Sequence, residues 1–172
     1  MTGLEKLTLV LGGARSGKSA WAEGIVLESG LEPVYVATAE PLDDEMAARI
    51  ARHRSERDPR FRTVEAPRDL ARAIARESRP GRAILVDCLT LWLTNLMVAG
   101  QPLDEAEAAL TRALETASGP VVLVSNEVGQ GVVPVDRMSR DFIDAAGRLH
   151  QALARRADAV FLLTAGLAQR LK

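Results

Sequence analysis

The sequence is poor in cysteine and in net charge, and it has no long uninterrupted apolar run. Its one cysteine, Cys88, excludes an intramolecular disulfide framework and fits a reducing compartment. The formal net charge of −1 gives no electrostatic case for a nucleic-acid partner or a membrane surface. The most apolar region, 83–99, is interrupted by Asp87 and Asn95, so we expect no membrane insertion.

The rest of the composition is that of an ordinary globular protein. The chain has 172 residues, of which 47% are hydrophobic and 26% are charged. This length suits one domain with a substantial core, so we expect a single domain over 1–172. The first apolar run begins so close to Met1 that we expect no signal peptide and a cytoplasmic location.

The segment 12–19, Gly-Gly-Ala-Arg-Ser-Gly-Lys-Ser, fits the phosphate-loop pattern G-x-x-x-x-G-K-[ST]. It lies between an apolar run at 7–11, which predicts a buried strand, and a helical pattern over 19–27. In this setting backbone N–H groups and the helix N-terminus bind phosphate oxygens. Lys18 then contacts the β- and γ-phosphates, and the Ser19 hydroxyl can bind Mg²⁺. The chain is therefore predicted to bind a nucleoside triphosphate.

The lysine of this loop is notable because lysine is rare in the chain. Lys6, Lys18 and Lys172 are the only lysines, against nineteen arginines. A compact ammonium group on a flexible stem suits a point contact with phosphates better than a planar guanidinium does. The choice of lysine at this position supports phosphate binding.

Short apolar runs alternate with helical patterns along the chain. We expect strands at 7–11, 34–37, 83–86, 121–124 and 159–163, an edge strand from 167, and helices at 19–27, 43–58, 67–78, 90–98, 104–117 and 142–156. The strands lack polar alternation, which is typical of a parallel sheet with helices on both faces. The predicted fold is an α/β P-loop domain, whose strand ends bring 12–19, 37–39, Asp87 and 125–127 to one crevice.

Asp87 ends an apolar strand, which is the position of the metal-binding acid in P-loop proteins. A carboxylate there can hold Mg²⁺ opposite the phosphate loop. Asp is also favoured as the cap of a following helix, which is the alternative for this residue. The phosphate loop favours the metal role.

The segment 49–62 concentrates positive charge in an otherwise neutral chain. Six arginines lie around His53, and only Glu56 and Asp58 offset them. This surface can bind anions, and an imidazole beside phosphates can act as a nucleophile or a base. The alternative is a solvated arginine-rich helix with an idle histidine. The other histidine, His150, lies in an apolar helical pattern and is predicted to be structural.

The segment 125–134 follows the fourth predicted strand. Its two glycines beside Asn126 and Glu127 suggest a loop whose backbone approaches a ligand, although a simple glycine turn fits as well. The Asn-Lys-x-Asp element that reads guanine in many GTPases is absent. If guanine is bound, other residues recognise it.

Four segments carry a resemblance to a known family. They are 12–19, Tyr-Val-Ala-Thr-Ala at 35–39, Asp-Asp-Glu-Met-Ala-Ala-Arg-Ile at 43–50 with His53, and Ser-Asn-Glu-Val-Gly-Gln-Gly-Val-Val-Pro at 125–134. Together they resemble the bifunctional adenosylcobinamide kinase / adenosylcobinamide-phosphate guanylyltransferase family. The phosphate loop is generic, whereas the Asp-Asp-Glu-Met and Asn-Glu-Val-Gly segments are far more specific.

The resemblance implies a RecA-like P-loop NTPase fold and two reactions of cobalamin nucleotide-loop assembly. A nucleoside triphosphate, ATP or GTP, phosphorylates the aminopropanol hydroxyl of adenosylcobinamide. GMP then passes from GTP to a histidine, with release of pyrophosphate, and on to adenosylcobinamide phosphate. The product is adenosyl-GDP-cobinamide. The resemblance also implies a homo-oligomer, which is a trimer in this family.

The resemblance further implies roles for individual residues. His53 matches the histidine that becomes guanylylated, and Lys18 is its catalytic partner at the phosphate loop. Ser19 and Asp87 are the expected Mg²⁺ ligands. The nucleotide contacts carry over to Gly12, Gly13, Ala14, Arg15, Ser16, Gly17, Lys18, Ser19, Ala37, Thr38, Ala39, Arg54, Ser55, Glu56, Arg57, Glu65 and Asp87.

Two other functions remain open on the residues alone. One is a P-loop small-molecule kinase without guanylyl transfer, in which His53 only binds phosphate. The other is a nucleotide-dependent switch that binds GTP and a protein partner without group transfer. Labelling of the protein by GTP carrying a labelled α-phosphate distinguishes the first, and turnover of adenosylcobinamide excludes the second.

Overall fold

The computed structural model describes residues 3–41 and 43–172. Its strands are β1 (Leu7–Gly12), β2 (Glu32–Ala37), β3 (Arg62–Glu65), β4 (Arg82–Asp87), β5 (Val121–Asn126), β6 (Ala159–Thr164) and β7 (Leu167–Arg170). Its helices are α1 (Lys18–Glu28), α2 (Asp44–Glu56), α3 (Leu70–Glu77), α4 (Leu89–Val98), α5 (Leu103–Glu115) and α6 (Arg137–Arg156). No helix within these ranges is long and apolar enough to cross a bilayer.

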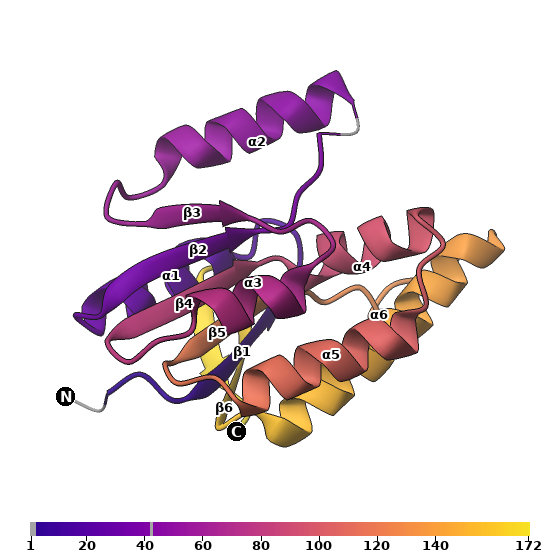
Figure 1. Cartoon of the computed structure of the whole chain (residues 1–172). Coiled ribbons are helices and arrows are strands. Elements are labelled where there is room, and N and C mark those ends of the chain that lie inside the picture. Colours follow the sequence, from indigo (N-terminus) through magenta and orange to yellow (C-terminus); the bar gives the residue numbers. More distant parts are fainter. Residues whose placement is uncertain (1–2, 42) are drawn as a thin grey trace.

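The strands form one sheet in the order β3-β2-β4-β5-β1-β6-β7 (Figure 1). Every pair of neighbouring strands from β3 through to β6 is parallel. Strand β7 pairs with β6 in the antiparallel direction. Parallel neighbours require crossover connections, and helices supply them. The mostly parallel sheet confirms the predicted fold class.

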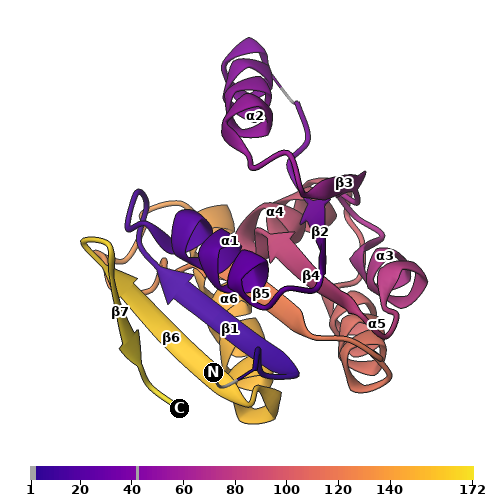
Figure 2. The ribbon, with the colours of Figure 1, turned by 90° about the vertical axis from the view of Figure 1, so that its left-hand side faces the viewer.

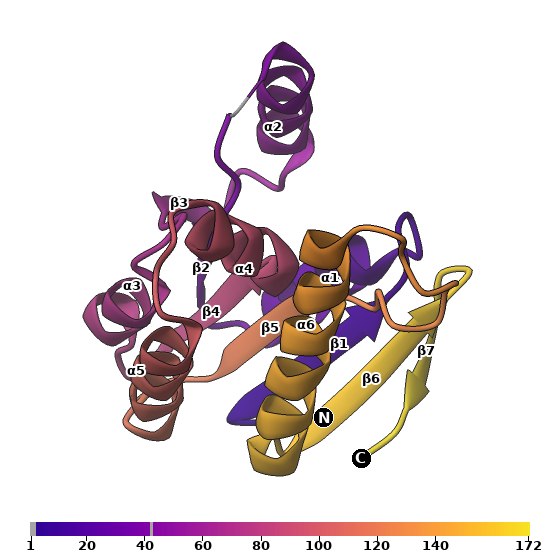
Figure 3. The same cartoon turned by 90° about the vertical axis from the view of Figure 1, so that its right-hand side faces the viewer.

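The two faces of the sheet are covered unequally. Helix α1 packs on one face, where Ala22 and Val26 meet Val10, Leu85 and Val124. Helices α3, α4, α5 and α6 pack on the other face (Figure 3). Neighbouring residues of a strand point to opposite faces, and both faces are buried, so the central strands read as continuous apolar runs.

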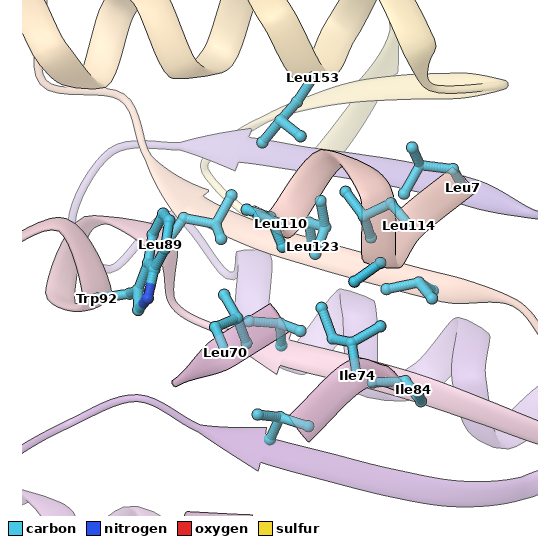
Figure 4. Close-up of a cluster of buried hydrophobic side chains, with 14 of the residues drawn as sticks. Leu7, Leu70, Ile74, Ile84, Leu89, Trp92, Leu110, Leu114, Leu123 and Leu153 are labelled. Carbon is cyan, nitrogen blue, oxygen red and sulfur yellow. The ribbon is translucent and has the colours of Figure 1, made fainter. Parts of the chain in front are cut away.

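The larger core lies on the face that carries four helices. Figure 4 shows its side chains between the strands and the helices, among them Leu70, Ile74, Trp92, Leu110 and Leu153. All five are at most 1% exposed. The Trp92 indole N–H donates to the Arg68 carbonyl at 2.8 Å, which satisfies the polar atom of this buried ring. This core fixes β1, β4 and β5, whose carboxyl ends form the candidate site.

Helix α2 is the exception to this packing. Figure 2 shows it set apart from the body, beyond the edge strand β3. The Asp43 side chain accepts a hydrogen bond from the Met46 N–H at 2.7 Å and caps the helix. Met46 and Ile50 are half-buried, whereas most of the other helix residues that the structure describes are exposed. The local sequence therefore forms the helix, but little packing holds it to the sheet.

Three expectations for the elements are corrected by the structure. Strand β3 was not expected, because its four residues carry two charges and no buried side chain. Helix α6 begins at Arg137, not at 142, because the Asp136 side chain caps it by accepting from the Ser139 N–H at 2.8 Å. Helix α3 begins at Leu70, not at 67. The edge strand from 167 is confirmed as β7.

Candidate functional site

The carboxyl ends of neighbouring strands form one row across the sheet. Glu65 of β3, Ala37 of β2 and Asp87 of β4 are aligned in register. On the other side of β5, the strand end at Asn126 is aligned with Gly12 of β1. The parallel topology therefore brings the phosphate loop, 37–39, Glu65 and Asp87 to one edge of the sheet.

The phosphate loop is a tight turn between β1 and α1. Gly17 adopts φ +90° where the loop enters the helix, a conformation that favours glycine. Within the loop, the Gly13 carbonyl accepts from the Ser16 N–H at 3.2 Å and from the Lys18 ammonium group at 3.0 Å. Lys18 is buried and Ser19 is half-buried, whereas Gly13, Ala14 and Arg15 are exposed. The loop thus presents its backbone outward, with the lysine stem folded beneath it.

The β6–β7 hairpin supports this loop from the side. The Gly166 N–H donates to the Ser16 carbonyl at 2.9 Å, and a side-chain carbon on Gly17 would lie 3.1 Å from the Gly166 Cα atom. Among the residues that the structure describes, the buried Ser16 hydroxyl has no hydrogen-bond partner. Gly166 carries no recognisable signal in the sequence, because its contact joins residues 150 positions apart. Buried polar groups are normally paired, so the Ser16 hydroxyl is available to a ligand.

Asp87 lies on the face of the sheet that α1 covers. Its Oδ2 atom accepts a hydrogen bond from the Tyr35 hydroxyl at 2.9 Å. Glu23, on the same face, interacts with Asp87 and Arg57 through charge. Burial raises the pKa of the Glu23 carboxyl, the Arg57 guanidinium opposes this rise, and the Asp87 carboxylate adds to it. Neither Tyr35 nor Glu23 was identified from the sequence.

The hydroxyl, N–H and carbonyl groups of Thr38 all form hydrogen bonds within the chain. Its hydroxyl accepts from the Cys88 N–H at 2.8 Å and donates to the Cys88 carbonyl at 2.7 Å. Its N–H donates to the Asp87 carbonyl at 3.2 Å, and its carbonyl accepts from the Asn95 amide at 2.7 Å. The side chain therefore ties the end of β2 to the end of β4. Ala37 and Ala39 on either side are half-buried.

Helix α2 places His53 beyond the edge strand β3, away from the phosphate loop. His53 is exposed, and its neighbour Arg54 forms an ion pair with Glu65 at 3.6 Å. Strand β3 is four strand positions from β1, which at a spacing of about 4.8 Å is about 19 Å. Ser55 and Glu56 are exposed as well. Arg54 and Glu65 therefore lie together beside β3. Glu65 shares the carboxyl edge of the sheet with the phosphate loop but lies four strand positions from it, and His53 lies beyond β3.

Arg57 follows α2 and turns back onto the sheet. Its guanidinium carbon lies 3.3 Å from the centre of the Tyr35 ring, and its Nη1 donates to the Thr63 hydroxyl at 2.8 Å. Its Nε atom is buried and has no hydrogen-bond partner among the described residues. Arg57 therefore contacts its own chain, and not the edge of the sheet where the other expected nucleotide contacts lie.

The donor set is suited to Mg²⁺ bound together with a triphosphate. Magnesium prefers oxygen ligands and keeps several waters, so one or two protein oxygens suffice beside phosphates. Ser19 and Asp87 supply such oxygens. In residues 3–41 and 43–172, no group of three or more His, Cys, Asp or Glu side chains could hold a metal on its own. The residues fit a metal that is brought in with the nucleotide.

The loop after β5 borders the phosphate loop. The Glu127 N–H donates to the Gly12 carbonyl at 2.9 Å, and the Glu127 carboxylate accepts from the Gly129 N–H at 2.7 Å. Further along, the loop and α6 enclose a hollow of about 290 Å³, which is lined by Gly129, Gly131, Val132, Val133, Pro134, Arg140, Ile143 and Asp144. The start of this segment therefore contacts the phosphate loop, and a ligand contact by its glycines stays a prediction.

Comparison with known proteins identifies the class and then the family. A solved structure, the flagellar accessory protein FlaH from Methanocaldococcus jannaschii, matches with a TM-score of 0.53 and 14% identity over 99% of this chain and 80% of that chain. This likeness shows a shared fold, and together with the phosphate loop it places the chain among the α/β P-loop proteins. Residues 8–171 match the family described as "Cobinamide kinase / cobinamide phosphate guanyltransferase", and the chain belongs to this family.

Two curated relatives agree with this assignment along almost their whole length. The Bifunctional adenosylcobalamin biosynthesis protein CobP of Pseudomonas aeruginosa is 51% identical over 166 residues, covering 95% of this chain and 96% of the relative. The protein CobU of Salmonella typhimurium, with the same description, is 40% identical over 181 residues, covering 96% and 99%. The expectation of an enzyme that is both a kinase and a guanylyltransferase is confirmed.

Proposed function

We propose that this chain carries out both reactions with one phosphate loop, as a single domain over 1–172. It phosphorylates adenosylcobinamide with ATP or GTP, and it then transfers GMP from GTP to adenosylcobinamide phosphate. The observation that carries the proposal is the row of strand ends. It places the phosphate loop and the expected nucleotide contacts at 37–39 and Asp87 at the same edge of the sheet. We place this enzyme in the cytoplasm, where both nucleotides are available.

In the kinase step, the loop 12–19 holds the triphosphate by its backbone N–H groups and Lys18. The aminopropanol hydroxyl oxygen of adenosylcobinamide attacks the γ-phosphorus, and the hydroxyl proton passes to solvent. The bond from the γ-phosphorus to the bridging β-phosphate oxygen breaks, and the nucleoside diphosphate leaves with its electrons. Phosphoryl transfer needs positioned phosphates and neutralised charge more than covalent help from the protein. Ser19 and Asp87 would hold Mg²⁺ when it is bound with the nucleotide, and the metal would supply further positive charge at the phosphates.

In the guanylyl step, a ring nitrogen of His53 attacks the α-phosphorus of GTP. The bond from the α-phosphorus to the β-phosphate oxygen breaks, and pyrophosphate leaves. An oxygen of adenosylcobinamide phosphate then attacks the same phosphorus, the N–P bond breaks, and His53 is regenerated. A covalent intermediate divides one difficult displacement into two easier ones. The arginines around His53 stabilise the charge of the transferring group.

This mechanism requires α2 to approach the phosphate loop. His53 is held beyond β3, four strand positions from the loop, whereas its reaction takes place on a nucleotide bound there. Helix α2 lies apart from the body and most of its described residues are exposed, so few contacts have to be broken. The free-energy cost of its approach is therefore small. Arg54, Ser55 and Glu56 would move toward the nucleotide with the helix, whereas Glu65 stays in place on β3.

The deciding experiment is self-labelling of the purified protein with GTP and Mg²⁺. GTP labelled at the α-phosphate should leave an acid-labile, alkali-stable label on the protein, and GTP labelled at the γ-phosphate should not. The variant His53→Ala should lose the label and keep part of the kinase activity. The variant Glu45→Gln, on the same exposed helix but outside the arginine-rich segment 49–62, is the matched control and should keep the label.

Two outcomes would change the proposal. No α-label in a protein that still binds GTP would leave a small-molecule kinase in which His53 only contacts phosphate. Equal loss of both activities in a folded His53→Ala protein would contradict the separation of roles. We also propose a homotrimer, and sedimentation equilibrium should then give a mass about three times the 18.5 kDa of one chain.

A further inference from the structure

Tyr35 is the only tyrosine of the chain, and it lies in the middle of an apolar strand. Val34 and Val36 point to the face covered by α3 to α6, and Tyr35 points to the face covered by α1. The side chain is 4% exposed. A phenylalanine or valine would fill such a position without a polar atom to satisfy, so the hydroxyl calls for a specific explanation.

The hydroxyl of Tyr35 contacts the strand-end acid. It donates to Asp87 Oδ2 at 2.9 Å. In the register of β2 and β4, Tyr35 is opposite Leu85, and Asp87 is opposite Ala37, two residues further along. A phenol is protonated at neutral pH, so the hydroxyl is the donor of this bond and the carboxylate its acceptor. A hydrogen bond to a carboxylate restricts the rotation of that carboxylate. Asp87 is therefore held in one orientation before a ligand arrives.

The ring of Tyr35 makes a second contact, with the end of α2. The Arg57 guanidinium carbon lies 3.3 Å from the ring centre, within the range of a cation–π interaction. Phe61 packs edge-on against the same ring, with centroids 5.8 Å apart and an interplanar angle of 87°. Because the Arg57 Nε has no partner among the described residues, the ring and Thr63 provide the contacts that fix this guanidinium.

From these contacts we infer that Tyr35 is a positioning residue that serves both halves of the nucleotide site. Its hydroxyl orients Asp87 for the metal–nucleotide complex, and its ring fixes the point about which α2 turns. The inference rests on the proposed function, since Asp87 matters here through Mg²⁺ and the nucleotide. Tyr35 itself touches neither substrate nor metal.

Two substitutions separate the two contacts. Tyr35→Phe removes the hydroxyl and keeps the ring, whereas Tyr35→Leu removes both. The first readout is calorimetric: the gain in GTP affinity when Mg²⁺ is added. We expect Tyr35→Phe to reduce this gain about tenfold, because changing a residue that orients a metal ligand typically costs ten- to hundredfold in metal affinity. GTP affinity without Mg²⁺ and the thermal midpoint should stay close to those of the parent.

A double-mutant cycle tests whether Tyr35 acts through Asp87. Asp87→Asn should lower the Mg²⁺-dependent gain, and adding Tyr35→Phe to Asp87→Asn should lower it no further. If Asp87→Asn lowers the gain and Tyr35→Phe does not, the inference is wrong while the proposed function stands. If Asp87→Asn has no effect, the metal role of Asp87 is wrong and the inference about the hydroxyl falls with it.

Hydrogen exchange of residues 44–56 tests the ring contact. Tyr35→Phe should leave the exchange of these amides unchanged, and Tyr35→Leu should accelerate it. Arg57→Gln removes the cation without altering the core and should accelerate the same amides, so a poorly folded Tyr35→Leu protein does not end the test. Unchanged exchange in both Tyr35→Leu and Arg57→Gln would overturn the claim that the ring anchors α2.

Discussion

At the scale of single residues, Gly12 depends on the absence of a side chain more than its neighbour Gly13 does. A side-chain carbon on Gly12 would lie 2.8 Å from the Leu163 carbonyl oxygen and would also collide with the Ser16 side chain. Nothing lies within 4 Å of the corresponding position on Gly13. Ser16 could rotate away, but the backbone of β6 cannot move without disturbing the sheet. The loop therefore tolerates a methyl group at one glycine and not at the other.

We expect Gly12→Ala to weaken GTP binding by at least about tenfold, since the loop must shift to accommodate the methyl group. Gly13→Ala is the matched control and should bind GTP within about twofold of the parent. Fluorescence titration with a labelled nucleotide measures both. Equal affinities of the two variants would show that the contact with Leu163 does not shape the loop.

Because of His150, we expect the folded protein to lose stability in mild acid. Its Nε2 lies 2.7 Å from the Ser125 hydroxyl in a buried pair, and burial lowers the pKa of the imidazole from its ordinary 6.5, partly opposed by Glu127. The unfolded chain therefore takes up the proton first. The contribution of His150 is complete above pH 6.5 and is lost as the pH falls through the lowered value.

The variant His150→Gln cannot take up this proton and keeps a polar side chain at the position. We expect its thermal midpoint to fall less than that of the parent when the pH is lowered from about 7.5 to about 5. Parallel curves for the two proteins would mean that another group controls the acid response. This outcome would also leave the structural role that the sequence suggested for His150 without support.

At the scale of elements, α2 should respond to the nucleotide more than any other helix. The exposed position of α2 beyond β3 leaves its amides protected mainly by the helix itself. If the helix closes over a bound nucleotide, saturating GTP with Mg²⁺ should slow the exchange of residues 44–56 by at least about tenfold. Helix α5, packed against α3 far from the site, is the internal reference. No slowing in α2 would contradict the proposed approach of His53.

The central elements could be predicted from the sequence because their signals are local. The runs at 7–11, 83–86 and 121–124 are buried on both faces, so all their residues except Thr8 are apolar. Strand β3 has no such signal. It is an edge strand in which Arg62 pairs with the buried Glu77 of α3, a contact that a sequence pattern does not show.

The candidate site could be predicted only where one segment carries the whole motif. The phosphate loop and Asp87 are recognisable because strand, loop and following residues are contiguous. Tyr35, Glu23 and Gly166 act through residues that are distant in the sequence, and their types are unremarkable in isolation. The carried-over contacts at Arg54 to Arg57 and Glu65 remain predictions, since the structure holds α2 away from the phosphate loop.

At the scale of the whole molecule, two activities with one phosphate loop should fail together when that loop is damaged. The Lys18 ammonium group is held at the loop by the Gly13 carbonyl, where it can turn to bound phosphates. We expect Lys18→Ala to lower both turnover rates by about 10²–10³, the usual cost of removing one charge-stabilising donor. His53→Ala should abolish guanylyl transfer and keep part of the kinase activity. Kinase turnover that survives Lys18→Ala would point to a second triphosphate site.

The contact between Gly166 and the phosphate loop has a consequence for folding during synthesis on the ribosome. Strand β1 pairs with β5 and β6, so the loop made first is completed by segments made last. At about 5–20 residues per second, Gly166 follows Ser16 by roughly 8 to 30 s. A nascent chain therefore displays its phosphate loop long before the partner that shapes it exists. Nucleotide can assist only the final stage of folding, when the β6–β7 hairpin closes against the loop.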